Sequence, residues 1–383
     1  VGESARQLCE DAGLMLDEII SGKSLQARAD AKPNEKLDVI VTFRTPPGQM
    51  DKNDVGIMGG DVKRHFKSIP GMALSLPAGA VAALAKRPNV EWVTLDVPVQ
   101  GMGKPGGIVT AKAKPTDPDG PTVPMDPTDF TGKGVTIAIL DSGIANHSDL
   151  KGRVIDRVNL VSQDKFTGDR WGHGTHVAGI IAGSGASFKE KLYTGIAYEA
   201  SLVDVRVLEQ AGNGKVSEVI AGIDWVLENK TRLDIRIMNL SLGHRILESA
   251  SVDPLVQAVE RAWDSGIVVV VSAGNYGRDG SFSITSPGNS PKVITVGSLT
   301  DYRNLDPADD MVSTYSSRGP SLIDHYAKPD LLAPGNRIVS LNVSGSTLDT
   351  LYPDNVLCKS PKSCPYIELS GTSMSAPQVA ATV

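Results

Sequence analysis

The stretch Val135-Thr136-Ile137-Ala138-Ile139-Leu140 is almost continuously apolar and ends at Asp141. Further apolar runs follow it, and helix-like segments separate them. Near-continuous apolar strands that alternate with helices are typical of a parallel sheet covered by helices on both faces. The sequence therefore predicts an α/β domain over residues 131–383. Strands are expected at residues 202–208, 235–240, 267–271 and 293–296, and helices at 173–182, 217–228 and 253–264.

The chain upstream of this domain divides into three regions. Residues 1–35 carry Leu8, Ala12, Met15 and Ile19 at helical spacing, which predicts an amphipathic helix in an N-terminal extension. Residues 36–97 predict a small ferredoxin-like α+β domain of order β-α-β-α-β. Its strands are expected at 37–43, 72–76 and 90–97, and its helices at 60–67 and 78–86. Residues 98–130 are rich in Gly, Pro, Lys, Thr and Asp, and indicate a linker open to proteolytic cleavage.

Composition limits the classes of partner. The 383 residues include 44 acidic and 38 basic side chains, for a net charge of −6 at pH 7. This balance gives no support for nucleic acid or an anionic membrane as a partner, and no apolar run is long enough to span a bilayer. Cys9, Cys358 and Cys364 are too few for a disulfide scaffold. The short loop between Cys358 and Cys364 leaves two possibilities open, a local disulfide or two separate thiols.

Four polar residues occupy positions where active sites form in such folds. Asp141 and Asn275 each follow an apolar strand, and the carboxyl ends of parallel strands meet at one edge of a sheet. His173 begins a helix, and Ser373 lies in a small-residue turn before another helix, whose N-terminus offers unpaired N–H groups. A serine nucleophile needs a base, the base needs an orienting carboxylate, and the tetrahedral intermediate needs hydrogen-bond donors. Taken singly, each residue also fits a structural role as a cap, a turn or a packed side chain.

A metal hydrolase is the competing interpretation of the histidines. His173 and His176 are three residues apart on the expected helix, a spacing that two metal ligands can use. The sequence has no His-Glu-x-x-His motif and no third His or Cys at metal-site spacing, which disfavours zinc. His176 is therefore expected to pack against the sheet.

The segments around Asp141, His173, Asn275 and Ser373 together resemble, in this order, the four signature blocks of the subtilisin-like serine proteases. The resemblance covers residues 131–383. It implies a serine endopeptidase with an Asp141–His173–Ser373 triad and an oxyanion hole assisted by Asn275. It also implies strand edges and a pocket that bind substrate, formed by Ser241, Leu242, Gly243, Gly212, Gly214, Ala273 and Gly274.

The same resemblance extends to specificity and cofactors. The small residues of the pocket leave room for a large apolar side chain, and Tyr276 adds no negative charge, so broad specificity with an apolar bias is expected. No cofactor is expected to be required. Asp149, Asp164 and Asp169 are weak candidates for calcium ligands.

Residues 36–97 are similar to the inhibitory propeptide of this family, above all over residues 82–97. This similarity implies a zymogen that cuts itself within the linker, with the propeptide as an intramolecular inhibitor. Protein or peptide substrates and a secreted location follow by the same resemblance, as does a catalytic domain that continues past Val383. The alternative function is a catalytically silent subtilase-like module for binding or folding.

Overall fold

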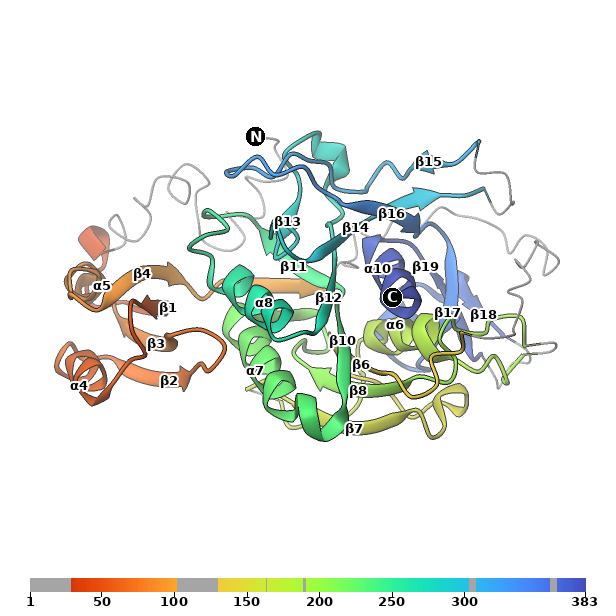
Figure 1. Ribbon diagram of the computed structural model, residues 1–383, viewed down its shortest axis with the longest axis horizontal. Helices are drawn as coiled ribbons and strands as arrows, with labels where there is room; N and C mark the ends of the chain where they lie inside the picture. Colours follow the sequence, from red (N-terminus) through yellow and green to blue (C-terminus); the bar gives the residue numbers. More distant parts are fainter. Residues whose placement is uncertain (1–28, 102–129, 163, 189–190, 303–307, 359–363) are drawn as a thin grey trace.

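The computed structural model describes residues 29–101, 130–162, 164–188, 191–302, 308–358 and 364–383. They form a small N-terminal α+β domain and a larger α/β domain (Figure 1). The helix expected within residues 1–35 lies almost entirely outside the described residues, as does Cys9. Among the helices described, none is both long and apolar enough to cross a membrane.

The larger domain is built on a sheet of strand order β15-β14-β12-β10-β6-β8-β7. The central strand β6 (Thr136–Asp141) is buried at every residue and pairs in parallel with both neighbours. Burial on both faces explains why this strand is a continuous apolar run. The other strands are β7 (Val154–Asn159), β8 (Ser201–Arg206), β10 (Ile235–Leu240), β12 (Val268–Ser272), β14 (Ile294–Thr300), β15 (Met311–Val312) and β16 (Leu331–Pro334), which pairs with β14. All of these pairs are parallel except β14–β15.

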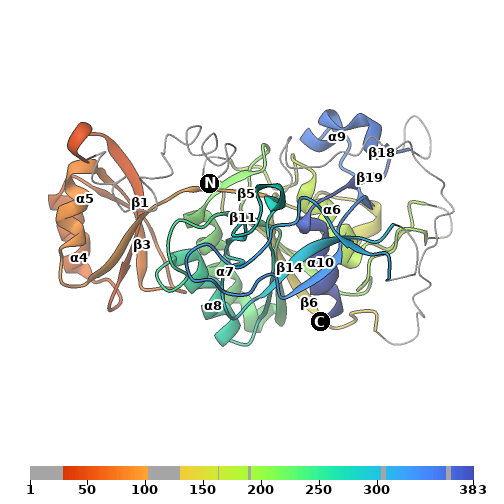
Figure 2. The ribbon, with the colours of Figure 1, turned by 90° about the horizontal axis from the view of Figure 1, so that it is seen from above.

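Helices cover both faces of this sheet (Figure 2). α6 (His173–Ala182) and α10 (Thr372–Thr382) pack against each other on one face, and α7 (Val216–Leu233) packs with α8 (Pro254–Asp264) on the other. The predicted strands and helices of this domain are all found, although α7 continues past its expected end at residue 228. The predicted α/β architecture is confirmed. β7 was missed because it is only partly buried and carries charged residues.

The start of α8 illustrates how local sequence places a helix. The Asp253 side chain accepts hydrogen bonds from the backbone N–H groups of Leu255 and Val256, at 2.8 and 3.2 Å. Pro254, which has no N–H to satisfy, occupies the first helical position. The apolar side chains that follow recur on one face and are buried against the sheet.

The N-terminal domain has the antiparallel strand order β2-β3-β1-β4, which is the ferredoxin-like arrangement. Side chains of the central strand β1 alternate between two cores: Leu37, Val39 and Val41 pack inside this domain, whereas Ile40 belongs to the core of the larger domain. One face of the small sheet is therefore buried against its neighbour. The elements are β1 (Lys36–Phe43), α4 (Gln49–Ile57), β2 (Asp61–His65), β3 (Gly71–Pro77), α5 (Ala78–Ala85) and β4 (Val90–Leu95).

Two expectations for this region are wrong. The helix expected at residues 60–67 is the strand β2, and the helix before it, α4, was not predicted. β2 is a polar edge strand with every second residue exposed, and α4 buries only Val55, so neither shows a clear hydrophobic period. The domain therefore has the order β-α-β-β-α-β.

The linker expected at residues 98–130 begins with a strand, β5 (Pro98–Gly101). β5 lies between β9 (Asn213–Lys215) and β11 (Leu242–Arg245) of the larger domain, antiparallel to both, and β13 (Thr285–Ser286) completes this sheet. Composition could not reveal β5 because its partners lie more than 100 residues away. Residues 102–129 of the linker lie outside the described residues.

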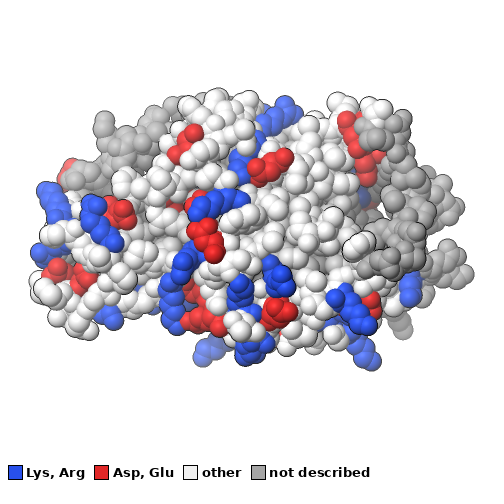
Figure 3. Space-filling view, viewed as in Figure 1, with Lys and Arg blue, Asp and Glu red and all other residues white. Residues whose placement is uncertain are grey.

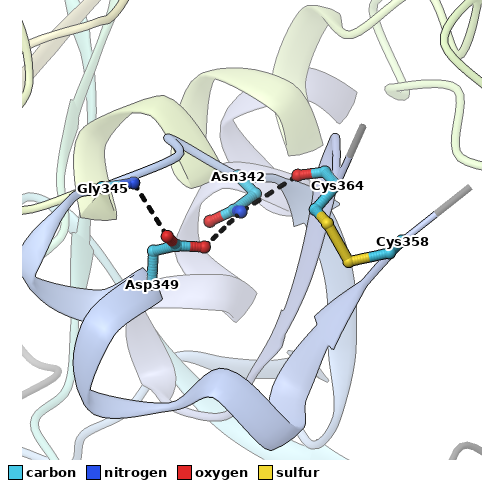
Figure 4. The surroundings of a disulfide bond; sticks show 5 residues. All are labelled: Asn342, Gly345, Asp349, Cys358 and Cys364. Atoms are coloured by element: carbon cyan, nitrogen blue, oxygen red, sulfur yellow. Dashed lines mark hydrogen bonds between the residues drawn. A yellow bond between two sulfur atoms is a disulfide. The ribbon is translucent and has the colours of Figure 1, made fainter. Parts of the chain in front are cut away.

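A third sheet precedes α10 and contains the disulfide. β17 (Ile338–Leu341) and β18 (Val356–Leu357) flank β19 (Tyr366–Leu369), and α9 (Thr347–Leu351) lies in the connection. Cys358 and Cys364 form a disulfide, so the first of the two open possibilities is the one found (Figure 4). Asn342 donates to the Cys364 carbonyl at 3.0 Å and to Asp349 Oδ1 at 2.7 Å, and so links Cys364 to α9.

Candidate active site

Asp141 and His173 form a buried pair at the carboxyl end of β6. His173 Nδ1 lies 2.8 Å from Oδ1 and 2.9 Å from Oδ2 of Asp141, and both side chains are at most 1% exposed. Asp141 Oδ1 also accepts the backbone N–H of Ser142 at 2.7 Å, which fixes the carboxylate. The pair orients the ring with Nδ1–H toward Asp141, and therefore leaves Nε2 as the basic nitrogen. Nε2 is buried and forms no hydrogen bond within the described residues.

The close approach of α6 to β6 depends on Gly174. A Cβ atom at this position would lie 2.2 Å from the Gly143 carbonyl oxygen and 3.1 Å from Asp141 Cβ. The Gly174 N–H donates to Ser142 Oγ at 3.0 Å, which fastens the helix start to the end of the strand. The glycine after His173 therefore allows the imidazole to reach its carboxylate.

Asp169 organises the turn that carries His173. Its carboxylate is buried and accepts backbone N–H bonds from Trp171, Gly172 and Thr175, at 2.7 to 3.1 Å. The hydroxyls of Ser142 and Thr175 donate to it at 2.9 and 2.7 Å. Burial raises the pKa of Asp169, and the hydrogen bonds from Gly172 and Thr175 oppose that shift. An aspartate four residues before the histidine, just ahead of a helix start, was the available sequence signal for this role.

Replacing Asp169 by asparagine is expected to lower the free energy of unfolding by about 2 kcal/mol or more, because its amide N–H₂ would face N–H donors. Urea denaturation in a Ser373→Ala background, which prevents self-cleavage, measures the change. Asp61→Asn is the matched control, since Asp61 lies on the surface in an ion pair with Lys36. Equal denaturation midpoints for the two variants would rule out the organising role of Asp169.

Ser373 lies at the N-terminus of α10, beside the end of β10. Its hydroxyl donates to the Ser241 carbonyl oxygen at 3.1 Å, and the Ser241 hydroxyl donates to the Ser373 carbonyl oxygen at 3.1 Å. α10 and α6, which carry Ser373 and His173, are packed together. The structure thus places the serine at the same edge of the sheet as the Asp141–His173 pair, with its hydroxyl turned to Ser241.

Asn275 is held against the residue before Ser373. Its Oδ1 accepts the backbone N–H of Thr372 at 2.9 Å and the Thr372 hydroxyl at 3.0 Å. Thr372 Oγ1 also accepts the backbone N–H of Gly274 at 3.2 Å, so the loop after β12 is joined to the start of α10. These bonds fix the side-chain amide of Asn275 next to the serine.

The structure separates the two histidines of the metal interpretation. His176 Nε2 lies 3.2 and 3.1 Å from the carbonyl oxygens of Ile338 and Ile367, away from Asp141. Burial lowers the pKa of His176 to about 3, so this imidazole is neutral and donates to a carbonyl. Within the described ranges, no three His, Cys, Asp or Glu side chains are grouped so that they could hold a metal ion.

The three calcium candidates are bonded to protein groups instead of facing one another. Asp149 accepts from the Tyr366 hydroxyl at 2.5 Å and from the backbone N–H of Ser187 at 3.0 Å. Asp164 pairs with Arg206 at 2.7 Å, and Asp169 has the five donors described above. A calcium role for these residues stays a prediction.

Four of the residues predicted to bind substrate flank the strand β5. Gly212 and Gly214 lie at β9 on one side of β5, and Leu242 and Gly243 lie in β11 on the other. Ser241 precedes β11, and Ala273 and Gly274 follow β12 toward Asn275. Trp171 was missed by the sequence analysis, although its indole stacks on the His173 ring with centroids 4.5 Å apart. Its position two residues before the histidine was the only signal.

Comparisons with known proteins identify the family of the chain. The subtilase family, Peptidase S8, matches residues 132–383. Serine protease AprX of Bacillus subtilis is 46% identical over 253 residues, which cover 65% of this chain and 55% of AprX. Subtilisin E of Bacillus subtilis is 31% identical over 366 residues, covering 93% of this chain and 82% of that protein.

Two further comparisons involve a fungal relative and a solved structure. Subtilisin-like protease 1 of Trichophyton tonsurans is 32% identical over 327 residues, covering 83% of this chain and 54% of that protein. The crystal structure of a cold adapted subtilisin-like serine proteinase aligns with a TM-score of 0.49 and 34% identity, over 66% of this chain and 75% of that chain. The chain spans about half the length of AprX and of the fungal protease. With this family match over well more than half of its residues, the chain belongs to the subtilase family of serine endopeptidases.

Proposed function

We propose that the protein is a serine endopeptidase, made as a zymogen, in which Ser373, His173 and Asp141 act as the catalytic triad. The buried hydrogen-bonded pair of Asp141 and His173 carries this proposal. Such a pair holds one tautomer of the ring and stabilises the imidazolium that forms during catalysis. The intact serine, histidine, aspartate and asparagine positions argue against the catalytically silent alternative.

The reaction follows from these positions. Ser373 exchanges its bond to Ser241 for one to His173 Nε2, and its Oγ attacks the peptide carbonyl carbon while its proton moves to Nε2. The Ser373 backbone N–H and Asn275 Nδ2 bind the oxyanion. Protonated His173 then gives this proton to the leaving amine as the C–N bond breaks. Water, deprotonated by His173, hydrolyses the acyl-enzyme and restores Ser373.

Contacts between the two domains support an inhibitory role for the N-terminal domain. Asp96 accepts the backbone N–H and the hydroxyl of Ser217, at 2.9 and 2.6 Å, at the start of α7. Asp224 of α7 accepts the backbone N–H groups of Lys67 and Ser68, at 2.9 and 2.6 Å. Each domain thus provides a carboxylate that accepts hydrogen bonds from the backbone of the other domain. Basic and acidic side chains are interspersed on the face seen in Figure 3.

The strand β5 supports a specific site of self-cleavage. The chain leaves the N-terminal domain and enters the substrate-binding edges as β5, where Gln100 pairs with Gly243 and Gly101 pairs with Leu242. The pairing runs toward the nucleophile, because Leu242, the partner of Gly101, is one residue from Ser241, whose carbonyl accepts the Ser373 hydroxyl. We therefore place the scissile bond after Met102, an apolar residue that fits the expected pocket preference.

N-terminal sequencing of the purified full chain tests this function. The expected new N-terminus is Gly103-Lys104-Pro105, and the Ser373→Ala variant should stay uncut under the same conditions. First cleavage elsewhere between residues 103 and 130 would contradict the register. Equal cleavage of the Ser373→Ala variant would show that a foreign protease makes the cut.

After cleavage, the N-terminal domain is expected to dissociate more readily as the pH rises. Trp92 Nε1 donates to Glu248 at 2.6 Å across the junction. Burial, followed by repulsion from Asp253, raises the pKa of Glu248 to about 8, although the hydrogen bonds from Trp92 and Thr94 act in the opposite direction; burial also raises the pKa of Asp96. A carboxyl with a raised pKa favours the bound state below its unbound pKa, and this contribution is lost as the pH rises through about 8.

Gel filtration of the self-cleaved complex at pH 6 and pH 9 measures this release. More free N-terminal domain is expected at pH 9, and Glu248→Gln should remove most of the difference because it no longer titrates. Greater release at pH 6 would contradict the assignment.

The residues of the pocket and the disulfide bear on substrate specificity and on cellular location. The small residues Gly243, Ala273 and Gly274 support an apolar preference at the residue before the scissile bond. The Cys358–Cys364 disulfide supports an oxidising and therefore secreted environment, since such bonds are rare in the cytosol.

A further inference from the structure

The glycine at the end of β5 has no room for a side chain. Gly101 is buried, and a Cβ atom on it would lie 2.2 Å from Cζ3 and 2.4 Å from Cη2 of Trp171. Leu208 Cδ1 would lie 3.0 Å away on another side. The backbone of Gly101 is that of an extended strand, which any residue adopts. Space, and not backbone conformation, therefore demands glycine here.

Trp171 is held so that it cannot retreat from this position. Its indole stacks on the His173 ring, with an interplanar angle of 19°. Gly212, which has φ +75°, contacts the indole from another side. A Cβ atom on Gly212 would lie 2.5 Å from the indole. The backbone of Trp171 is fixed as well: its N–H donates to Asp169, and its carbonyl accepts the N–H of Leu348 at 3.1 Å. The side chain is fully buried among packed neighbours, so it has no space to move away from a Cβ atom at position 101.

We propose that Trp171 is a specificity-determining residue that admits only glycine at the position held by Gly101, the second residue on the acyl side of the scissile bond. This inference rests on the proposed function, since β5 stands in for a substrate strand. A larger residue would press the indole onto the His173 ring, and so would disturb the base as well as the substrate backbone. The favoured substrates are therefore proteins or peptides with glycine followed by an apolar residue, a narrower class than the broad specificity expected from the sequence.

Two matched fluorogenic peptides test the proposal on the self-cleaved protein. One ends in Pro-Val-Gln-Gly-Met before the fluorophore, as residues 98–102 do, and the other has alanine in place of the glycine. The glycine peptide should have a kcat/KM about 10- to 100-fold higher, the range expected from overpacking a rigid contact by one methyl group. In Trp171→Ala the ratio should fall to within about threefold, even if both rates drop because His173 has lost its stacking partner.

Self-cleavage of the full chain provides an independent test that needs no change to Trp171. Gly101→Ala should slow self-cleavage by a similar factor, and the double variant Gly101→Ala/Trp171→Ala should recover part of the rate. Gln100→Ala is the control, because it alters the same strand one residue away without adding an atom near Trp171. Equal rates for Gly101→Ala and Gln100→Ala, or equal cleavage of the two peptides by the unmodified enzyme, would overturn the proposal and leave the proteolytic function standing. Cleavage of neither peptide, together with no self-cleavage, would overturn both.

Discussion

Replacing Ser373 by alanine is expected to lower kcat by about a million-fold, the loss that follows removal of the nucleophile from a triad that works as a unit, as in subtilisin. The residual rate should come from oxyanion donors and substrate binding, and self-cleavage should stop. Peptide hydrolysis by a matured sample and gel analysis of the full chain measure both effects.

The control for this variant is Ser142→Ala. Ser142 is also a buried hydroxyl at the site, but it donates to Asp169 and accepts the backbone N–H of Gly174. Ser142→Ala should reduce activity far less than Ser373→Ala. A Ser373→Ala protein that retains more than about a thousandth of the original kcat would show that another group is the nucleophile.

Replacing Asp141 by asparagine is expected to lower kcat by about ten-thousand-fold while the fold is retained. Asparagine preserves the shape of the side chain, but its N–H₂ group facing His173 Nδ1 favours the tautomer with the proton on Nε2. That tautomer cannot accept the serine proton. The kcat at neutral pH should fall with little change in KM, because Asp141 acts through the ring and not on substrate.

Asp164→Asn is the matched control for the aspartate variant. Asp164 pairs with Arg206 near the site but has no bond to His173. Its replacement should leave kcat within about tenfold, the scale of an ion pair that is partly exposed. Equal losses of kcat for Asp141→Asn and Asp164→Asn would show that the Asp141–His173 pair has no particular role in catalysis.

The core of the larger domain could be predicted because burial on both faces imposes a distinctive sequence. β6, β10 and β12 are largely apolar and buried, and two of the catalytic candidates, Asp141 and Asn275, follow β6 and β12. Asp141 lies at the carboxyl end of its strand, where active sites form in parallel sheets, and the structure pairs it with His173 at the start of α6; their catalytic roles stay a prediction. The polar edge strand β2 has no such constraint, and its sequence favoured the wrong element.

The features that sequence reasoning missed depend on contacts across long distances along the chain. β5 becomes a strand only because β9 and β11 supply its partners, so its composition indicated a linker. The sequence analysis did not assign Asp169 its bonds to the backbone N–H groups of the turn before α6, because those bonds depend on the folded turn. Trp171 has no motif of its own, and its role follows from the space it leaves at Gly101.

The hydroxyl of Ser373 is turned toward Ser241, so its reactivity toward His173 is the central point to measure. The most direct measurement is the rate of labelling of the self-cleaved protein by a fluorophosphonate, with the modified residue located by mass spectrometry. A single adduct on Ser373 is expected, with a labelling rate that falls by orders of magnitude in His173→Ala. An adduct on a different residue, or an unchanged rate in His173→Ala, would contradict this mechanism.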